Sequence, residues 1–243
     1  MNKTIVITSI YQEFWGTKQF RKSCEQVGLP LYNAFRGNRF TGNGDVIRMI
    51  YEALQALENK YTYAIYADGA DSYFTKSFAP LDSCIIYSTE KAVWPPTTQM
   101  NKAWEDYYKI KYLPNINLFK NSLSGIYSSS PWKYLNGGGY CGPITLLLQF
   151  FERYGLDKLK GDVNGQDVQA LAFIKAHDEG FPIFLDTECR YFQTIGFEDP
   201  GDFTTILRSD IEPIIKNEKT GNYPSLFHGN GRTPLNWIYD LFK

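Results

Sequence analysis

Strand-like and helix-like segments alternate along the first ninety residues of this 243-residue chain. The strand-like runs occupy residues 4–10, 31–35, 63–67 and 84–87. Residues 17–27 and 45–59 lie between the first three runs and repeat apolar side chains at helical spacing. Because strands that alternate with helices form βαβ crossovers, they run parallel within one sheet. The sequence therefore predicts an α/β fold with a mostly parallel central sheet.

The rest of the chain gives no sign of a second domain. It continues with helix-like and strand-like segments, and it contains no internal repeat and no strong linker. We therefore predict one domain over residues 1–243. Residues 91–133 are rich in Pro, Asn, Ser and Trp, and we expect an irregular insertion there with one helix near residues 102–110.

Composition excludes several classes of protein. Hydrophobic residues make up 43% and charged residues 21%, which is typical of a folded globular chain. A net charge of −1 provides no overall field for nucleic acid. The four cysteines show no CxxC spacing, so we expect reduced core thiols. The first apolar run is too short for a signal peptide, and no run approaches the about 18 residues of a membrane span. We therefore expect a cytoplasmic protein with no membrane partner.

Two aspartates, Asp68 and Asp71, directly follow the third strand in the sequence YAIYADGADSYF. One aspartate after a strand is most often a turn residue, because its carboxylate accepts local backbone N–H groups. Two carboxylates in one turn repel each other, and a shared cation relieves that repulsion. Ligands of open α/β sheets bind beyond the carboxyl ends of the strands. The pattern therefore predicts a site for Mn²⁺ or Mg²⁺, which bind carboxylate and diphosphate oxygens together.

Six segments extend the argument to nearly the whole chain: YADGADSYF, IIYSTEKAVWP, YLNGGGYCG, GQDVQ, LDTECRYFQTI and FHGNGRTPLNWI. In this order they resemble the glycosyltransferase domain of the procollagen lysyl hydroxylase and glucosyltransferase family. More distantly, the chain is similar to glycogenin-type retaining transferases. The resemblance implies a GT-A (Rossmann-like) fold and an enzyme that moves a sugar from a UDP-sugar to a hydroxyl acceptor, with retention.

The resemblance also implies roles for individual residues. Three of them would ligate the cation: Asp68, Asp71 and His228. Residues that would bind the donor sugar are Trp94, Asn136, Gly137 and Gly138. Residues that would face the uracil are Thr8 and Ile10. A glycine loop would bring backbone N–H groups to the diphosphate through Gly229, Asn230 and Gly231. Asp167, together with Asn136, would assist the transfer itself.

From the residues alone, other readings stay open. His228 is equally a structural histidine, and the glycines of YLNGGGYCG are equally a tight turn or bulge. The family has a cluster of aspartates where this chain has only Asp167, and a lysine where this chain has Asp45. Arg36 or Arg48 would then supply the phosphate contact.

Two alternative functions stay open, the first because the acidic cluster is reduced and the second because a transferase without its acceptor transfers sugar to water. One is a module that binds UDP-sugars without turnover, and the other is a nucleotide-sugar hydrolase. The acceptor of a transferase would be a hydroxylated protein, a glycan or a modified DNA base, in a bacterial or viral setting. We expect residues 91–133 to shape the acceptor site, since they form the longest irregular segment beside the predicted catalytic edge.

Overall fold

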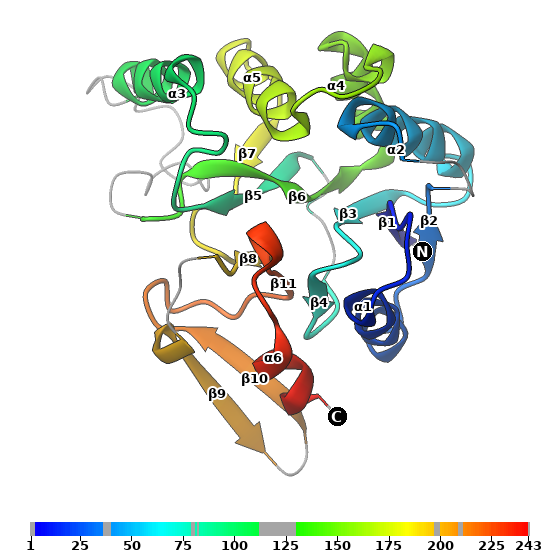
Figure 1. The fold of residues 1–243 in the computed structure, drawn as a ribbon, viewed down its shortest axis with the longest axis vertical. Coiled ribbons are helices and arrows are strands. Elements are labelled where there is room, and N and C mark those ends of the chain that lie inside the picture. The colour runs from blue at the N-terminus through cyan, green and yellow to red at the C-terminus, as the bar shows by residue number, and fades with distance from the viewer. Residues whose placement is uncertain are drawn as a thin grey trace.

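The computed structural model describes residues 3–35, 40–78, 81, 83–111, 130–196, 200–208 and 211–242. A six-stranded sheet in the order β2-β1-β3-β6-β5-β7 forms its centre (Figure 1). The strands are β1 (Thr4–Thr8), β2 (Leu31–Asn33), β3 (Tyr63–Ala67), β5 (Ile85–Glu90), β6 (Tyr134–Pro143) and β7 (Ile183–Leu185). All neighbours pair in parallel except where β6 pairs with β3 and β5. The predicted α/β class with a mostly parallel central sheet is confirmed.

Helices cover both faces of this sheet (Figure 1). One face carries α2 (Asn43–Leu57), α3 (Thr98–Lys111), α4 (Ile144–Arg153) and α5 (Gly165–Asp178). The other face carries α1 (Trp15–Gln26). Side chains of a strand alternate between faces. In β3, Ala64 and Tyr66 join the core of the first face, whereas Ile65 and Ala67 join the core of the second. A strand covered on both faces is apolar throughout, which explains the unbroken YAIYA run.

A second layer of strands lies below the central sheet in Figure 1. It contains a three-stranded sheet of β4 (Ser72–Phe74), β11 (Leu226–His228) and β8 (Phe192–Thr194), in the order β4-β11-β8. A two-stranded ribbon, β9 (Phe203–Arg208) with β10 (Ile211–Asn217), and the closing helix α6 (Asn236–Leu241) complete this part. His228 pairs with Ser72 across the β11–β4 ladder, so strand register brings it beside Asp71. Three short 3₁₀ turns are η3 (Leu156–Lys158), η4 (Pro200–Asp202) and η5 (Asn230–Arg232).

The glycines of YLNGGGYCG form no turn, because β6 runs through them to Pro143, but the β5–β6 register shifts between Tyr87 and Thr89 beside them, in agreement with a bulge. They allow close packing on both sides of the strand. A Cβ on Gly138 would lie 2.2 Å from Cε1 of His228, and one on Gly139 would lie 3.0 Å from Cδ1 of Phe192. Glycine inside a strand marks such close approaches. The sequence also failed to predict β4, β9 and β10.

Other predictions concern the insertion and the surface. The helix predicted near residues 102–110 is present within α3, and residues 112–129 of the predicted insertion lie outside the described residues. All four cysteines are buried and none forms a disulfide, as predicted. No helix in the described part of the chain is long and apolar enough to cross a membrane.

Candidate metal centre between two cavities

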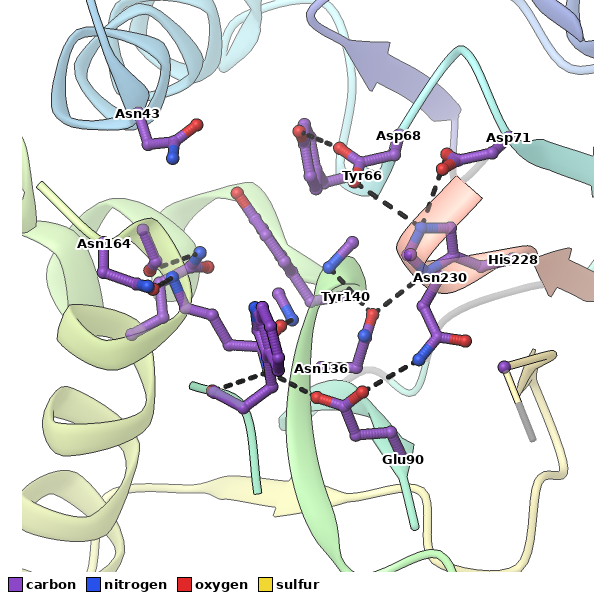
Figure 2. A pocket seen from close by; sticks show the side chains of 18 of the residues that line it. Asn43, Tyr66, Asp68, Asp71, Glu90, Asn136, Tyr140, Asn164, His228 and Asn230 are labelled. Carbon is purple, nitrogen blue, oxygen red and sulfur yellow. Dashed lines mark hydrogen bonds and ion pairs between the residues drawn. The ribbon is translucent and has the colours of Figure 1, made fainter. Parts of the chain in front are cut away.

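Asp68, Asp71 and His228 come together at the carboxyl end of β3 (Figure 2). Each offers one ligand atom, and these atoms all lie within 4.8 Å of one another. Nε2 of His228 lies 3.6 Å from Oδ2 of Asp68 and 3.4 Å from Oδ1 of Asp71. The three residues predicted as ligands thus form one cluster, and this cluster could bind a metal ion.

The backbone around the two aspartates is tightly held. The N–H of Asp68 donates to the carbonyl of Gly138 (3.0 Å), and the N–H of Gly229 donates to the carbonyl of Asp71 (2.7 Å). A Cβ on Gly69 would lie 2.5 Å from Oγ1 of Thr8, so the turn between the aspartates presses against the end of β1. These contacts explain why glycine stands between the two carboxylates and why the turn cannot drift away from His228.

The charges of the cluster depend on each other. Partial removal from water raises the pKa of Asp68; the nearby His228 lowers it, and the carboxylate of Asp71 raises it. Burial of the His228 ring lowers the pKa of that imidazole, but Asp71, Asp68 and Glu90 outweigh burial and raise it to about 9. Without a metal ion, a protonated His228 therefore neutralises part of the charge of the two aspartates at neutral pH. Two carboxylate oxygens and one imidazole nitrogen are a donor set that fits a divalent cation in place of that proton.

Neighbouring side chains also hold two of the candidate ligands, Asp68 and His228, in place. The hydroxyl of Tyr66 donates to Oδ1 of Asp68 (2.7 Å). Nδ1 of His228 lies 3.0 Å from Oδ1 of Asn136, which also accepts the N–H of Gly138 at 3.0 Å. Asn136 was predicted to bind the donor sugar, and its carbonyl oxygen instead faces His228, a candidate metal ligand.

A cavity of about 560 Å³ opens on one side of the cluster. We call it the amide cavity, because six carboxamide side chains line it: Asn43, Asn136, Asn164, Gln166, Gln169 and Asn230. Trp94 is 61% exposed and also lines it, together with Glu90 and Tyr140. Figure 2 shows several of these amides facing the same space.

A second cavity of about 600 Å³ lies on the other side, beside α1. We call it the aromatic cavity, because rings form much of its wall: Tyr11, Phe14, Trp15, Phe40, Tyr66 and Tyr239. Tyr11 and Phe40 lie with ring centroids 5.1 Å apart, and Trp15 packs edge-on against Tyr239 at 4.8 Å. Both cavities share a common boundary: Asn43, Val46, Tyr66, Asp68, Asp71 and Thr233.

Neither cavity has a Lys or Arg among the described residues that line it. The amide cavity instead contains three carboxylates, those of Asp68, Asp71 and Glu90. An anionic ligand would meet like charges there, which is costly in a partly dry site. A divalent cation held by the cluster would offset the charges of Asp68 and Asp71.

Some of the predicted site residues line one of the two cavities, and others line neither. Those that line the amide cavity are Trp94, Asn136, Gly137, Gly138, Asn230 and Gly231. Ile10 lines the aromatic cavity. Those that line neither are Thr8, Asp167 and Gly229. The N–H of Gly229 is already bound to Asp71, so it is not directed at a ligand.

Asp167 lies outside the cavities for a geometric reason. Consecutive helical residues point about 100° apart, whereas residues three apart share a face. Gln166 and Gln169 line the amide cavity, so the intervening Asp167 is turned away from it. Burial raises the pKa of this carboxyl. Arg48 also lines neither cavity and instead pairs with Asp45 and Glu52, while Arg36 lies outside the described residues.

Sequence reasoning missed three groups at this site: Glu90, Gln166 and the hydroxyl of Tyr66. Glu90 is only 5% exposed and accepts hydrogen bonds from Gln166 and from Asn230 (2.9 Å). Its burial raises the pKa of the carboxyl, while the amides lower it. The sequence did contain a signal for Glu90, because this carboxylate is the last residue of a buried strand, and Asp68 directly follows another buried strand.

The chain matches no model of a protein family, and no curated protein matches it. Fold and site together define an α/β protein with a candidate divalent-metal centre at the carboxyl edge of its sheet, between two cavities.

Proposed function

We propose that the protein is a metal-dependent glycosyltransferase of the GT-A type, which transfers a sugar from a UDP-sugar to a hydroxyl acceptor with retention. The observation that carries the proposal is the position of the Asp68, Asp71 and His228 cluster at the shared boundary of two chemically different cavities. A nucleoside diphosphate sugar has the same order of parts, with a flat base, a charged diphosphate and a neutral polyhydroxyl ring.

Each part of such a donor finds suitable chemistry. The rings of the aromatic cavity offer faces on which a base stacks. Carboxamides both donate and accept, so the amide cavity can hydrogen-bond sugar hydroxyls in either sense. Asp68 and Asp71 line both cavities, so a cation that they hold lies where a diphosphate between base and sugar would pass.

The donor set favours Mn²⁺ as the cation, because carboxylates suit Mg²⁺ and Mn²⁺ and the imidazole of His228 selects against Mg²⁺. A bound divalent cation supplies Lewis-acid stabilisation of the negative charge that develops on departing UDP. The described lining residues provide no Lys or Arg that could do this instead. The chain itself holds the ion, fixes its ligands through Tyr66 and Asn136, and surrounds the sugar with amides.

The sequence segments support the same proposal. Five of the six segments that resemble the lysyl hydroxylase family's glycosyltransferase domain contribute residues to the amide cavity, although these residues are spread from residue 66 to residue 233. Residues at one ligand site are expected to cluster in this way, whereas residues conserved for packing alone would be dispersed through the core.

Release of UDP tests the proposal. We expect purified protein to release UDP from at least one member of a panel of UDP-sugars in the presence of Mn²⁺. Excess EDTA should reduce the rate to background, and added Mn²⁺ should restore it. Full turnover in excess EDTA would contradict the role of the metal.

One observation favours a second candidate, a UDP-sugar-binding protein without turnover. Asp167, the carboxylate expected to assist transfer, lines neither cavity. This candidate predicts Mn²⁺-dependent binding of UDP with no UDP release from any sugar in the panel. A nucleotide-sugar hydrolase would release UDP at a rate that no acceptor increases, whereas a transferase should be stimulated by its acceptor.

The acceptor is proposed to approach past Trp94, which is exposed at the amide cavity and lies within the predicted insertion of residues 91–133. Exchange of that insertion should change the preference among hydroxylated protein, glycan and modified DNA while UDP affinity stays within about threefold, since none of its described residues lines the aromatic cavity. Activity on DNA would fall steeply as salt rises. Loss of UDP binding with unchanged acceptor preference would contradict this assignment.

A further inference from the structure

Glu90 is a buried carboxylate that the proposed transfer reaction does not use. No Lys or Arg of the described residues pairs with it. Carboxamides solvate it instead: Nδ2 of Asn230 donates to Oε2 at 2.9 Å and Nε2 of Gln166 donates to Oε1. The nearby amide of Asn136 lowers the pKa of the Glu90 carboxyl, as those two amides do. A carboxylate can only accept hydrogen bonds, so each amide must present its NH₂ group to Glu90.

Asn136 lies next to Glu90, and the N–H of Gly138 fixes its orientation by donating to its carbonyl oxygen. If its NH₂ group faces Glu90, its carbonyl oxygen must face the opposite way. There, Oδ1 accepts the N–H of Gly138 at 3.0 Å and lies 3.0 Å from Nδ1 of His228. Gly138 N–H is a donor and Glu90 is an acceptor, so both neighbours of the amide demand the same orientation. Figure 2 shows Asn136 between His228 and Glu90.

The orientation of Asn136 in turn decides which nitrogen of His228 carries a hydrogen. A carbonyl oxygen can only accept, so Nδ1 of His228 must be protonated. In the neutral ring the other nitrogen, Nε2, then has its lone pair free, and Nε2 is the atom that faces Asp68 and Asp71. Metal-ligating histidines commonly donate their second N–H to an acceptor that sets the tautomer.

We propose that Glu90 is a positioning residue that acts through Asn136 on His228, and that this carboxylate–amide–imidazole relay presents Nε2 of His228 to the metal ion. Packing supports the relay, because the ring lies against Gly138 so closely that a Cβ there would lie 2.2 Å from Cε1. The inference rests on the metal centre alone and holds whether or not the protein transfers sugars.

The chain has only two histidines, which makes the test direct. Protein labelled with ¹⁵N-histidine, without nucleotide, is titrated with diamagnetic Zn²⁺ and followed by NMR. In the wild type we expect His228 to keep its hydrogen on Nδ1 while Nε2 shifts on binding the ion. His177 provides the internal reference for a ring outside the cluster. Metal binding through Nδ1 of His228 would overturn the proposal.

Variants test the part played by Glu90. Glu90→Gln replaces one accepting oxygen with an NH₂ group that opposes the amides around it, so we expect Mn²⁺ affinity to fall about 10- to 100-fold and the Nδ1–H signal of His228 to weaken. Asn230→Ala is the matched control, because it removes an amide that binds Glu90 but does not touch His228. It should change neither the tautomer nor the Mn²⁺ affinity by more than about twofold. If Glu90→Gln fails to fold, Asn136→Ala provides the same test with the same expected loss. Unchanged Mn²⁺ affinity and tautomer in the folded variant would show the relay to be wrong.

Discussion

The amide cavity and the aromatic cavity are similar in volume, about 560 and 600 Å³, and they share the two aspartates, yet their walls differ in kind. In the amide cavity, Glu90 links amides from α5 and the β11–α6 connection by hydrogen bonds. In the aromatic cavity, four of the rings are 41–53% exposed: Tyr11, Phe14, Trp15 and Phe40. Hydrogen bonds cross-link the wall of the amide cavity, whereas the rings of the aromatic cavity are held only by packing. We therefore expect the amide cavity to be preorganised and the aromatic cavity to change shape when a ligand binds.

The difference suggests a division of work. A cross-linked polar wall can discriminate between arrangements of hydroxyl groups, because a mismatched amide is left without a partner. A wall of rings provides affinity for any flat group with little discrimination. Under the proposed function, the amide cavity selects the sugar and the aromatic cavity contributes affinity for the nucleotide. The metal cluster on the boundary should serve both.

The largest effect is expected when a candidate metal ligand on the boundary between the two cavities is replaced. Asp71→Asn keeps the size of the side chain and removes one of the ligand charges, so we expect Mn²⁺ affinity to fall about a hundredfold or more. Binding of UDP should fall with it, because the diphosphate loses its cation. Asp167→Asn is the matched control, since Asp167 lines neither cavity. Titration calorimetry measures both affinities, and equal Mn²⁺ binding by the two variants would contradict the cluster.

Acidification should weaken metal binding at the same cluster without a mutation. The pKa of His228 is raised to about 9, and only the neutral ring binds metal. Below that pH a proton must leave for each ion bound, so Mn²⁺ affinity should fall about tenfold per pH unit, or about a hundredfold from pH 8 to pH 6. Electron paramagnetic resonance of free Mn²⁺ measures this slope. His228→Gln should bind more weakly and with a much flatter dependence on pH, and a flat profile in the wild type would exclude His228 as a ligand.

A smaller effect should separate the aromatic cavity from the metal. The double variant Tyr11→Ala/Trp15→Ala removes two exposed rings that do not contact the cluster, so we expect UDP affinity to fall about tenfold while Mn²⁺ affinity without nucleotide stays the same. Leu207→Ala, at a 69% exposed site in β9, controls for loss of apolar surface. A parallel loss of Mn²⁺ affinity would mean that the two sites are not separable.

The smallest effect is expected at the mouth of the amide cavity. Trp94→Ala should weaken binding of the preferred UDP-sugar about threefold to fivefold and leave binding of UDP nearly unchanged, because Trp94 is 61% exposed and lines only the amide cavity. The ratio of the two dissociation constants is the informative quantity. If UDP and UDP-sugar lose affinity equally, the sugar does not lie in the amide cavity.

The sequence predicted the parts of the molecule that rest on local pattern. Periodicity located the strands around β3 and the helices α1 and α2, and the two aspartates after β3 pointed to the candidate cation site. It could not predict that β6 is antiparallel to its neighbours, since chain direction within a sheet depends on connections that local pattern does not encode. It also read the glycines of β6 as a turn, because their reason is a distant ring, His228, rather than local backbone conformation.

The site shows the same limit. Asp167 attracted attention as the only carboxylate in its segment, but helical rotation places Gln166 and Gln169 in the cavity instead. Asn136 was expected to contact sugar, yet its carbonyl oxygen is directed at a histidine 92 residues away in the sequence. Such pairings are fixed by tertiary contacts, and the residues that neighbour them in the sequence do not indicate them. Residue type and strand position pointed to Asp68 and Asp71 as candidate metal ligands, and the resemblance added His228, but neither indicated the groups that hold them.

The most direct test of a metal centre joining the two cavities is a calorimetric titration of UDP into the wild-type protein, with Mn²⁺ and then with excess EDTA. The three carboxylates of the amide cavity and the lack of a described Lys or Arg in either lining predict strong dependence on the ion. We expect UDP affinity to fall at least a hundredfold in EDTA and uridine, which lacks the diphosphate, to bind weakly and equally in both conditions. Equal UDP affinity with and without Mn²⁺ would contradict the account.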